Sequence, residues 1–282
     1  MAATEGSVLS PKAPSGELKK RVLSAIVMIA LALGVTYWGG WPFALFWLAA
    51  GIAMMVEWTE MVKIEPRRAV QAVFGLGLLA LTLVYLTGAG LAMGAATALG
   101  FLILGTLIAR GARKRLWAAS GFAYAAVMVL VPPMVRAYPE IGVLALIWMF
   151  GVVWATDIAA YFTGRALGGP KLCPSISPKK TWSGFLGGVF AAALAGVLVA
   201  WLGRRWGLDH SFGLWSVIAL SMVASVASQI GDLGESALKR HCDVKDSSHL
   251  IPGHGGVMDR LDGFWAVSFI LGIVLLVAHG VA

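Results

Sequence analysis

GFLGGVFAAALAGVLVAWLG, residues 184–203, is an apolar run without a single charged side chain. An α-helix needs about 20 consecutive apolar residues to cross the hydrocarbon core of a bilayer. Inside a bilayer every backbone N–H and C=O group must find its partner within the chain, and a helix provides that partner. The run therefore predicts a transmembrane helix, and similar runs recur along the chain.

The composition extends this prediction to the whole protein. Of the 282 residues, 59% are hydrophobic and only 13% are charged, and the mean hydropathy is +0.82. Soluble domains carry about 25% charged residues, so an ordinary soluble protein is excluded. We predict an all-α, polytopic integral membrane protein with about nine transmembrane helices. The expected spans are 22–38, 41–57, 70–87, 90–109, 119–136, 141–164, 184–203, 212–234 and 263–281.

The chain divides into three parts. Residues 1–20 are polar and are expected to form a mobile cytoplasmic tail, and 21–140 an N-terminal set of transmembrane helices that serves as a scaffold with possible dimer contacts. Residues 141–282 are expected to be the C-terminal catalytic region with its cytoplasmic loops. The short connection YWGGWP, residues 37–42, leaves open whether 22–57 is two spans or one interrupted pair.

The positive charges indicate the orientation in the membrane. Lys and Arg are retained on the cytoplasmic side of membrane proteins. With a cytoplasmic N-terminus, 19 of the 22 basic residues fall on that side, and only Arg136, Arg204 and Arg205 fall outside. We therefore interpret the net charge of +8 as a topology signal and expect no nucleic-acid binding. Cys173 and Cys242 show no disulfide or metal-ligand spacing and are expected to be free.

Two features of the apolar segments have simple structural interpretations. Glu57, Glu60 and Glu65 stand among the basic residues of 63–68, which favours a solvated, salt-bridged surface. The segments GLAMG (90–94) and GFLGG (184–188) place glycines four apart, a spacing that allows close helix packing or dimerisation. Packing within one subunit is the simpler interpretation.

The acidic residues gather in the second half of the chain. An ionised carboxylate at membrane depth is costly and is found facing a cavity, a partner charge or a metal. Seven of the 14 acidic residues lie near the cytoplasmic ends of the last four spans, a pattern that indicates a cation site. These residues are Asp157, Asp232, Glu235, Asp243, Asp246, Asp259 and Asp262.

Two helical patterns surround these acids. Asp157, Tyr161 and Arg165 recur at intervals of four and share one helix face, either as an intrahelical network or as part of a site. Ser221, Ser225 and Ser228 form one stripe with Asp232 and Glu235. We interpret this stripe as the wall of a hydrophilic cavity that opens to the cytoplasm, although serines alone are more often helix-packing residues.

Two loops supply basic and flexible groups. In GGPKLCPSISPKKTWSG, residues 168–184, prolines prevent a continuous helix and Lys179 and Lys180 present positive charges, which suits phosphate binding as well as a plain cytoplasmic loop. In PGHGGVMDRLDGF, residues 252–264, glycines would let backbone N–H groups converge on an anion. Asp259 and Asp262 would offer the hard oxygen ligands that Mg²⁺ prefers, or would simply favour a helix N-terminus.

These segments together resemble one known family. SALKRHCDVKDSSHLIPGHGGVMDRLD, residues 236–262, closely resembles the signature of the phosphatidate cytidylyltransferases, the CDP-diacylglycerol synthases. The resemblance extends back through QIGDLGES, SPKKTWSG and DIAAYFTGR and covers roughly 155–265. One position departs from the family pattern, because Ser183 stands where members usually have glutamate.

The resemblance implies a function and its partners. The implied reaction joins CTP and phosphatidic acid to give CDP-diacylglycerol and pyrophosphate. It implies an integral protein of a bacterial inner or cell membrane, with the active site facing the cytoplasm. It also implies Mg²⁺, in some members a second, monovalent cation such as K⁺, and a homodimer.

The expected site combines the residues of these motifs. The expected metal ligands are Asp232, Asp259, Asp262 and Asp246. The expected catalytic residues are Asp232, Asp259, Asp262, Lys239, Arg240 and His254. The expected substrate-binding residues are Lys179, Lys180, Ser177, Thr181, Lys245, Arg260, Gly255, Gly256, Asp157, Tyr161 and Arg165.

Two other functions fit parts of the pattern. A related membrane nucleotidyltransferase or phosphotransferase could act on an isoprenoid lipid phosphate instead. A cation-coupled transporter would also place acids and serines in a membrane cavity, but it predicts inverted repeats and access from both sides. The sequence shows no such repeat, and its polar clusters fall on one predicted side.

Overall fold

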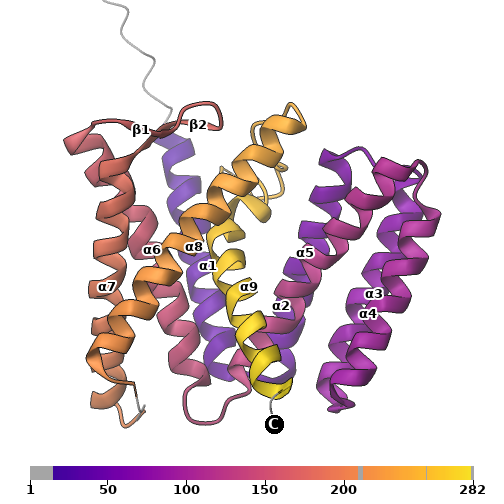
Figure 1. The fold of residues 1–282 in the computed structure, drawn as a ribbon, viewed down its shortest axis with the longest axis horizontal. Coiled ribbons are helices and arrows are strands. Elements are labelled where there is room, and N and C mark those ends of the chain that lie inside the picture. The colour runs from indigo at the N-terminus through magenta and orange to yellow at the C-terminus, as the bar shows by residue number, and fades with distance from the viewer. Residues whose placement is uncertain (1–14, 209–211, 252, 281–282) are drawn as a thin grey trace, which may run out of the picture.

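A computed structural model describes residues 15–208, 212–251 and 253–280 of the chain (Figure 1). The described residues form nine helices and one two-stranded hairpin. In chain order these are α1 (Ser15–Trp38), α2 (Gly40–Met61), α3 (Arg67–Thr87), α4 (Gly90–Ile108), α5 (Ala112–Arg136), α6 (Gly142–Leu167), β1 (Lys171–Cys173), β2 (Ser177–Thr181), α7 (Trp182–Arg205), α8 (Leu214–His241) and α9 (Met258–Gly280).

The helices confirm the predicted fold class. Within the described residues, eight helices, α2 to α9, are long and apolar enough to cross a membrane. Helix α1 adds a shorter apolar segment, Val22–Trp38. The protein is therefore an all-α polytopic membrane protein. The short hairpin is an addition that the sequence interpretation treated as a loop.

The N-terminal boundary and the first connection differ in detail from expectation. Helix α1 begins at Ser15, so residues 15–20 of the expected tail are helical, while 1–14 lie outside the described residues. Gly39 alone separates α1 from α2, and its φ of 72° is a conformation that glycine adopts without strain. Arg136 of α5 donates to the backbone oxygens of Thr36 and Tyr37 at the end of α1. The segment 22–57 is therefore two helices.

Helix α9 lies between two groups of helices (Figure 1). It packs against α8 and α6 on one side and against α5 on the other. An aromatic layer fills this junction: Phe264 of α9 stacks on Trp47 of α2 at 5.1 Å and on Phe150 of α6 at 4.7 Å between ring centroids. Trp265 stacks on Tyr124 of α5 at 4.2 Å. Large buried aromatic surfaces are strong contributors to core stability. The layer therefore holds the N-terminal and C-terminal helices together.

Small residues bring α6 and α7 into close contact. A Cβ atom on Gly184 would lie 2.7 Å from the backbone oxygen of Ala160, and one on Gly188 would lie 3.1 Å from that of Thr156. This pair of glycines packs within one subunit, as expected. Gly90 and Gly94 do not form such a contact, because Gly90 has no heavy atom within 4 Å of its Cβ position and Gly94 meets only Val84 at 3.9 Å.

Replacing Gly184 with alanine should therefore destabilise the helix bundle. The new methyl group would press on backbone, which cannot rotate away, and overpacking of this kind costs about 1–3 kcal/mol. We expect a lower melting temperature for Gly184→Ala in detergent. Gly100→Ala in α4 is the matched control, because its Cβ position meets nothing within 4 Å. Equal melting temperatures for the two variants would contradict the close packing.

The three serines of the α8 stripe are buried between helices, so the predicted cavity wall was wrong for them, while Asp232 of the same stripe lines a pocket. Ser221, Ser225 and Ser228 are at most 1% exposed. The Ser221 hydroxyl accepts a hydrogen bond from Trp148 Nε1, and the Ser225 hydroxyl accepts one from Thr156 Oγ1. Small hydroxyl side chains let helices approach closely and still bond across the contact. The stripe therefore sets the position of α8 against α6.

The hairpin covers the end of the bundle where α6 stops and α7 begins (Figure 1). Strands β1 and β2 pair antiparallel, with Lys171 opposite Thr181 and Cys173 opposite Ser177. Thr181 is the N-cap of α7, and its hydroxyl accepts a hydrogen bond from the backbone N–H of Gly184. Such a cap is worth about 1 kcal/mol to a helix. The cap fixes where the hairpin ends and the membrane helix starts.

Candidate active site

A polar pocket of about 660 Å³ lies beneath the hairpin, between α6, the start of α7 and α8. We call it the hairpin pocket. Seven of the residues expected to form the site line it. They are Asp157, Tyr161, Arg165, Lys179, Lys180, Thr181 and Asp232. These residues come from three elements, α6, β2 and α8, so the fold assembles the pocket.

Two polar contacts organise the side chains of the hairpin pocket. Lys180 Nζ lies 2.6 Å from Asp232 Oδ2 and joins the hairpin to α8. Arg165 donates a hydrogen bond of 2.9 Å to the Tyr161 hydroxyl, one turn earlier on α6. Asp157 lines the same pocket but accepts no hydrogen bond from the side chains that the structure describes. The intrahelical network therefore includes Tyr161 and Arg165, and Asp157 is left facing the pocket.

Ser183 holds the base of the hairpin. Its hydroxyl donates to the backbone oxygen of Gly168 and lies 3.0 Å from the Thr181 hydroxyl. Its backbone oxygen accepts from Thr163 of α6 at 3.4 Å. Ser183 thus ties the end of α6 to the start of α7. A short hydroxyl at this position connects the two helices through the hairpin base, at the position where the family pattern usually has glutamate.

A second group of charged residues lies where α8 ends and α9 begins. Lys239 Nζ is 2.6 Å from Asp259 Oδ1 and 3.4 Å from Glu235 Oε1. Asp262, one turn further along α9, lies beside Glu235. We call Glu235, Lys239, Asp259 and Asp262 the acid–lysine cluster. Lys239 is its central positive charge.

Asp259 is held by the loop that precedes α9. Its Oδ2 atom accepts from the backbone N–H and the hydroxyl of Ser247, both at 2.9 Å, and from the backbone N–H of Gly256 at 2.8 Å. Gly255 has a φ of 85°, and a Cβ there would lie 2.8 Å from Asp259 Oδ2. In this structure the Gly256 N–H group, expected to bind phosphate, is therefore bonded to Asp259.

Asp232 connects the hairpin pocket to the acid–lysine cluster. It pairs with Lys180 inside the pocket, and it lies close enough to Asp262 for the two charges to interact. The contact between α8 and α9 is close here, because a Cβ on Gly231 would lie 2.6 Å from the backbone oxygen of Asp262. The two groups therefore form one continuous polar site.

The remaining expected residues lie outside the lining of the hairpin pocket. Arg240, Lys245 and Asp246 are exposed, and the Cβ of Asp246 lies beside Gly255. Arg260 donates to the backbone oxygen of His254. The His254 ring instead contacts α1, with Nδ1 2.8 Å from the Ser24 hydroxyl. Ser177 is half-buried in β2, outside the pocket lining, and Pro252 of the motif lies outside the described residues.

Glu57 is the residue that the sequence interpretation misplaced. It was expected on a solvated surface, but it is 2% exposed and accepts hydrogen bonds from the loop before α9. Glu60 and Glu65 are exposed, as expected. The rule that marks acids at membrane depth as special would have selected Glu57, because it ends the apolar run of α2. Because Glu57 is close in sequence to the basic residues of 63–68, it was assigned to a solvated surface instead.

The charge balance of the site suits a cation. The site gathers the carboxyl groups of Asp157, Asp232, Glu235, Asp259 and Asp262, and among the described residues only Lys180 and Lys239 form ion pairs with them. Lys179 and Arg165 line the pocket without such a pair. Both carboxyl oxygens of Glu235 are buried without a hydrogen-bond donor among the described residues. Such a concentration of buried carboxyl oxygen fits a hard divalent ion. Among the described residues, however, no three His, Cys, Asp or Glu side chains are arranged as ligands of one ion.

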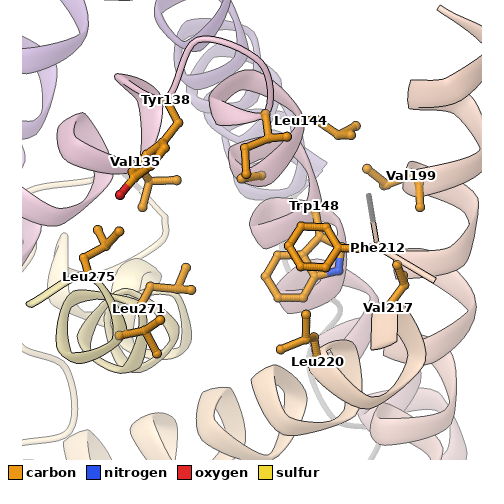
Figure 2. Close-up of a pocket in the computed structure, with 14 residues that line it drawn as sticks. Val135, Tyr138, Leu144, Trp148, Val199, Phe212, Val217, Leu220, Leu271 and Leu275 are labelled. Atoms are coloured by element: carbon orange, nitrogen blue, oxygen red, sulfur yellow. The ribbon is translucent and has the colours of Figure 1, made fainter. Parts of the chain in front are cut away.

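A second cavity lies at the opposite end of the bundle and has a different character. It measures about 370 Å³, and the side chains that line it are mainly aliphatic and aromatic (Figure 2). Leu271 and Leu275 face Trp148 and Leu220 across it in the close-up. Among the described residues that line it, none has a charged side chain to offer to a nucleotide or a phosphate. The hairpin pocket with the acid–lysine cluster is therefore the candidate active site.

Comparison with known proteins identifies the family. The model of the cytidylyltransferase family matches residues 19–278. A phosphatidate cytidylyltransferase of Brucella suis is 43% identical over 257 residues, which cover 90% of this chain and 92% of the relative. One of Staphylococcus haemolyticus is 30% identical over 263 residues, covering 92% and 99%. One of Staphylococcus aureus is 40% identical over 135 residues, covering 48% and 50%. The chain belongs to the cytidylyltransferase family.

Proposed function

We propose that this protein transfers the cytidylyl group of CTP to phosphatidic acid, giving CDP-diacylglycerol and pyrophosphate. The observation that carries the proposal is the continuous polar site at one end of a membrane-spanning fold. Lys180 and Asp232 meet there under the hairpin, and Lys239 and Asp259 meet beside them. A lipid phosphate at the membrane surface and a water-soluble nucleotide can both reach such a place. Two relatives that align over most of this chain, those of Brucella suis and Staphylococcus haemolyticus, carry the name of this activity.

To catalyse this reaction, the protein must mainly position the two substrates and neutralise the charge on their phosphates. The phosphate oxygen of phosphatidic acid attacks the α-phosphorus of CTP in line, the bond from that phosphorus to the β-phosphate oxygen breaks, and pyrophosphate leaves. The attacking phosphate is already anionic, so no strong base is required. Preorganised cations around the reacting groups are the usual source of the rate enhancement in such reactions.

The basic residues of the site have distinct places in this scheme. Lys179 and Lys180 line the hairpin pocket and would bind phosphate groups there. Arg165 lines the same pocket from α6. Arg240, Lys245 and Arg260 stand exposed outside the pocket lining, where they would guide anionic substrates inward. Lys239 is held between two carboxylates and would keep the cluster in place.

We further propose that the site uses Mg²⁺. Asp232, Asp259 and Asp262 would hold it, with Asp246 beside them, because they supply hard oxygen atoms at the negative centre of the site. When bound, the ion would neutralise the charge that develops on the phosphates. A second, monovalent cation such as K⁺ would suit the remaining carboxylates.

The proposal also includes the membrane in which the protein lies, its orientation and its oligomeric state. We place the site on the cytoplasmic side, because the basic residues concentrate at the connections expected there. The membrane would be the inner or cell membrane of a bacterium, as the organisms of the relatives suggest. We also propose a homodimer.

Purified protein in detergent tests the choice of substrate. With labelled CTP, Mg²⁺ and phosphatidic acid, we expect a labelled lipid product. An isoprenoid lipid phosphate in place of phosphatidic acid, and GTP or dATP in place of CTP, are expected to give little product. Stronger labelling of the isoprenoid phosphate would instead support the related lipid phosphotransferase. If no combination of substrate and metal gives labelled lipid, the proposed enzymatic activity is refuted.

A further inference from the structure

We propose that Glu57 is a positioning residue for the reaction, although it lies in α2, outside the C-terminal region that carries the family signature. This inference rests on the proposed function. Glu57 would hold the described residues of the loop before α9, 247–251 and 253–257, in the shape that places Asp259. The catalytic half of the chain would thereby depend on a single carboxylate of the N-terminal half.

The hydrogen bonds of Glu57 converge on that loop. Oε1 accepts from the Ser248 hydroxyl and from the backbone N–H of Val257, both at 2.7 Å. Oε2 accepts from the Ser247 hydroxyl at 3.1 Å and from the backbone N–H of Met258 at 2.8 Å. These four donors lie 190 to 201 residues away in the sequence. The side chain of Glu57 therefore joins α2 to a segment that lies 190 to 201 residues later in the sequence.

Glu57 also serves as the N-terminal cap of α9. Val257 and Met258 stand at the start of that helix, where the first N–H groups have no partner within the helix. A carboxylate is favoured there by the positive end of the helix dipole. Among the described residues, no Lys or Arg forms an ion pair with Glu57. Its charge is thus stabilised by the loop and the helix that it fixes.

Ser247 connects Glu57 directly to Asp259. Its hydroxyl lies 3.1 Å from Glu57 Oε2 and 2.9 Å from Asp259 Oδ2. The backbone N–H of Ser247 also donates to Asp259. A shift of Ser247 would therefore move two of the groups that hold Asp259.

The glycine at position 256 makes room for this arrangement. A Cβ there would lie 2.0 Å from the Ser247 hydroxyl and 2.6 Å from Glu57 Oε1. Both distances are far below a normal contact, so the loop can close over Glu57 only with glycine at 256. The motif glycine therefore serves the approach of Glu57, in addition to donating its N–H to Asp259.

Hydrogen bonds to neighbouring helices hold the part of α2 that carries Glu57 in place. The next residue, Trp58, donates its Nε1–H to the backbone oxygen of Trp117 in α5 at 2.8 Å. The hydroxyl of Thr59 accepts from Gln71 in α3 at 2.8 Å. Neighbouring helices thus fix the backbone on which Glu57 stands. A group held in this way can transmit its position to the loop.

Glu57→Gln is the sharpest test, because it keeps the shape and removes two acceptor sites. The amide nitrogen cannot accept a hydrogen bond, so either Val257 N–H and the Ser248 hydroxyl or Met258 N–H and the Ser247 hydroxyl lose their acceptor. We expect kcat to fall about tenfold or more, with KM for CTP and phosphatidic acid changed less than about threefold. Glu57→Asp keeps the charge and should recover part of kcat. Glu60→Gln is the matched control, because Glu60 is exposed on the same helix.

Two further measurements separate positioning from folding. Hydrogen exchange of peptides covering 246–258 should be faster in Glu57→Gln, while peptides from α4 exchange as in the wild type. Ser248→Ala removes a donor to Glu57 and, within the same loop, the acceptor of the Leu250 N–H. If Ser248 acts through Glu57, its effect on kcat should not multiply with that of Glu57→Gln. Activity is expressed per folded molecule at a temperature well below the melting transition.

Two results would overturn the inference. An unchanged kcat per folded molecule in Glu57→Gln would overturn the inference, even if the melting temperature fell. Unchanged exchange of 246–258 would overturn it as well. The exchange experiment needs no turnover. If the wild type formed no CDP-diacylglycerol, the proposed function would fail, and faster exchange would still support the anchoring by Glu57.

Discussion

Asp232→Asn should reduce CDP-diacylglycerol formation by a factor of about 10²–10³ or more, the range seen when a preorganised electrostatic group is lost. Asp232 lines the hairpin pocket, pairs there with Lys180, and lies close enough to Asp262 of the acid–lysine cluster for the two charges to interact. The amide keeps the shape but loses the charge that pairs with Lys180 and would bind Mg²⁺. Initial rates at saturating CTP and phosphatidic acid measure the effect.

The matched control for this variant is Asp243→Asn. Asp243 is an exposed acid just beyond the end of α8, and its φ of 56° is one that asparagine also adopts. We expect near wild-type turnover from the control and an unchanged melting temperature from both variants, because Asp232 is partly exposed. Near-normal turnover in Asp232→Asn would remove it from the site.

Lys239→Met should have the largest effect on stability. Lys239 is the only ammonium group within 4 Å of Asp259 and Glu235 among the described residues, and the two carboxylates are 6% and 2% exposed at their side chains. Removing one partner from a buried ion pair costs about 3–5 kcal/mol, because the other charge stays buried and unpaired. We expect a much lower melting temperature in detergent and a loss of turnover.

The double variant Lys239→Met/Asp259→Asn tests the origin of that effect. It removes both charges, so it should recover part of the lost stability and none of the activity. Arg68→Met is the control, because Arg68 is an exposed cation of α3 outside the site. A double variant that is less stable than Lys239→Met would show that the ion pair is not the source of the instability.

The sequence predicted the membrane helices well because each of them is marked by its own apolar run. The span 184–203 corresponds to α7, and the break at Gly39 lies within the aromatic connection that the sequence marked as ambiguous. The ion pairs of Lys180 and Lys239 could not be predicted in detail. The pairs Lys180–Asp232 and Lys239–Asp259 join residues 52 and 20 positions apart, and they depend on how the chain segments are packed.

Two misplaced features show where local patterns fail. The serines of α8 share a stripe with two acids, but the hydroxyls of Ser221 and Ser225 bond to α6, because a buried helix contact and a cavity wall have the same sequence period. Glu57 stands near Lys63 in the sequence, yet its partners come from a loop about 190 residues later. In both cases the tertiary contact, which no short segment encodes, decides the role of the residue.

The position of the label in the lipid product tests the central claim most directly. With CTP labelled at the α-phosphate, the wild-type protein should transfer label to phosphatidic acid, and with CTP labelled at the γ-phosphate it should not. This pattern follows from attack at the α-phosphorus and release of pyrophosphate. Lipid labelled from the γ-phosphate would show phosphoryl transfer, and lipid labelled from neither position would show no transfer; either result would contradict the proposed cytidylyl transfer.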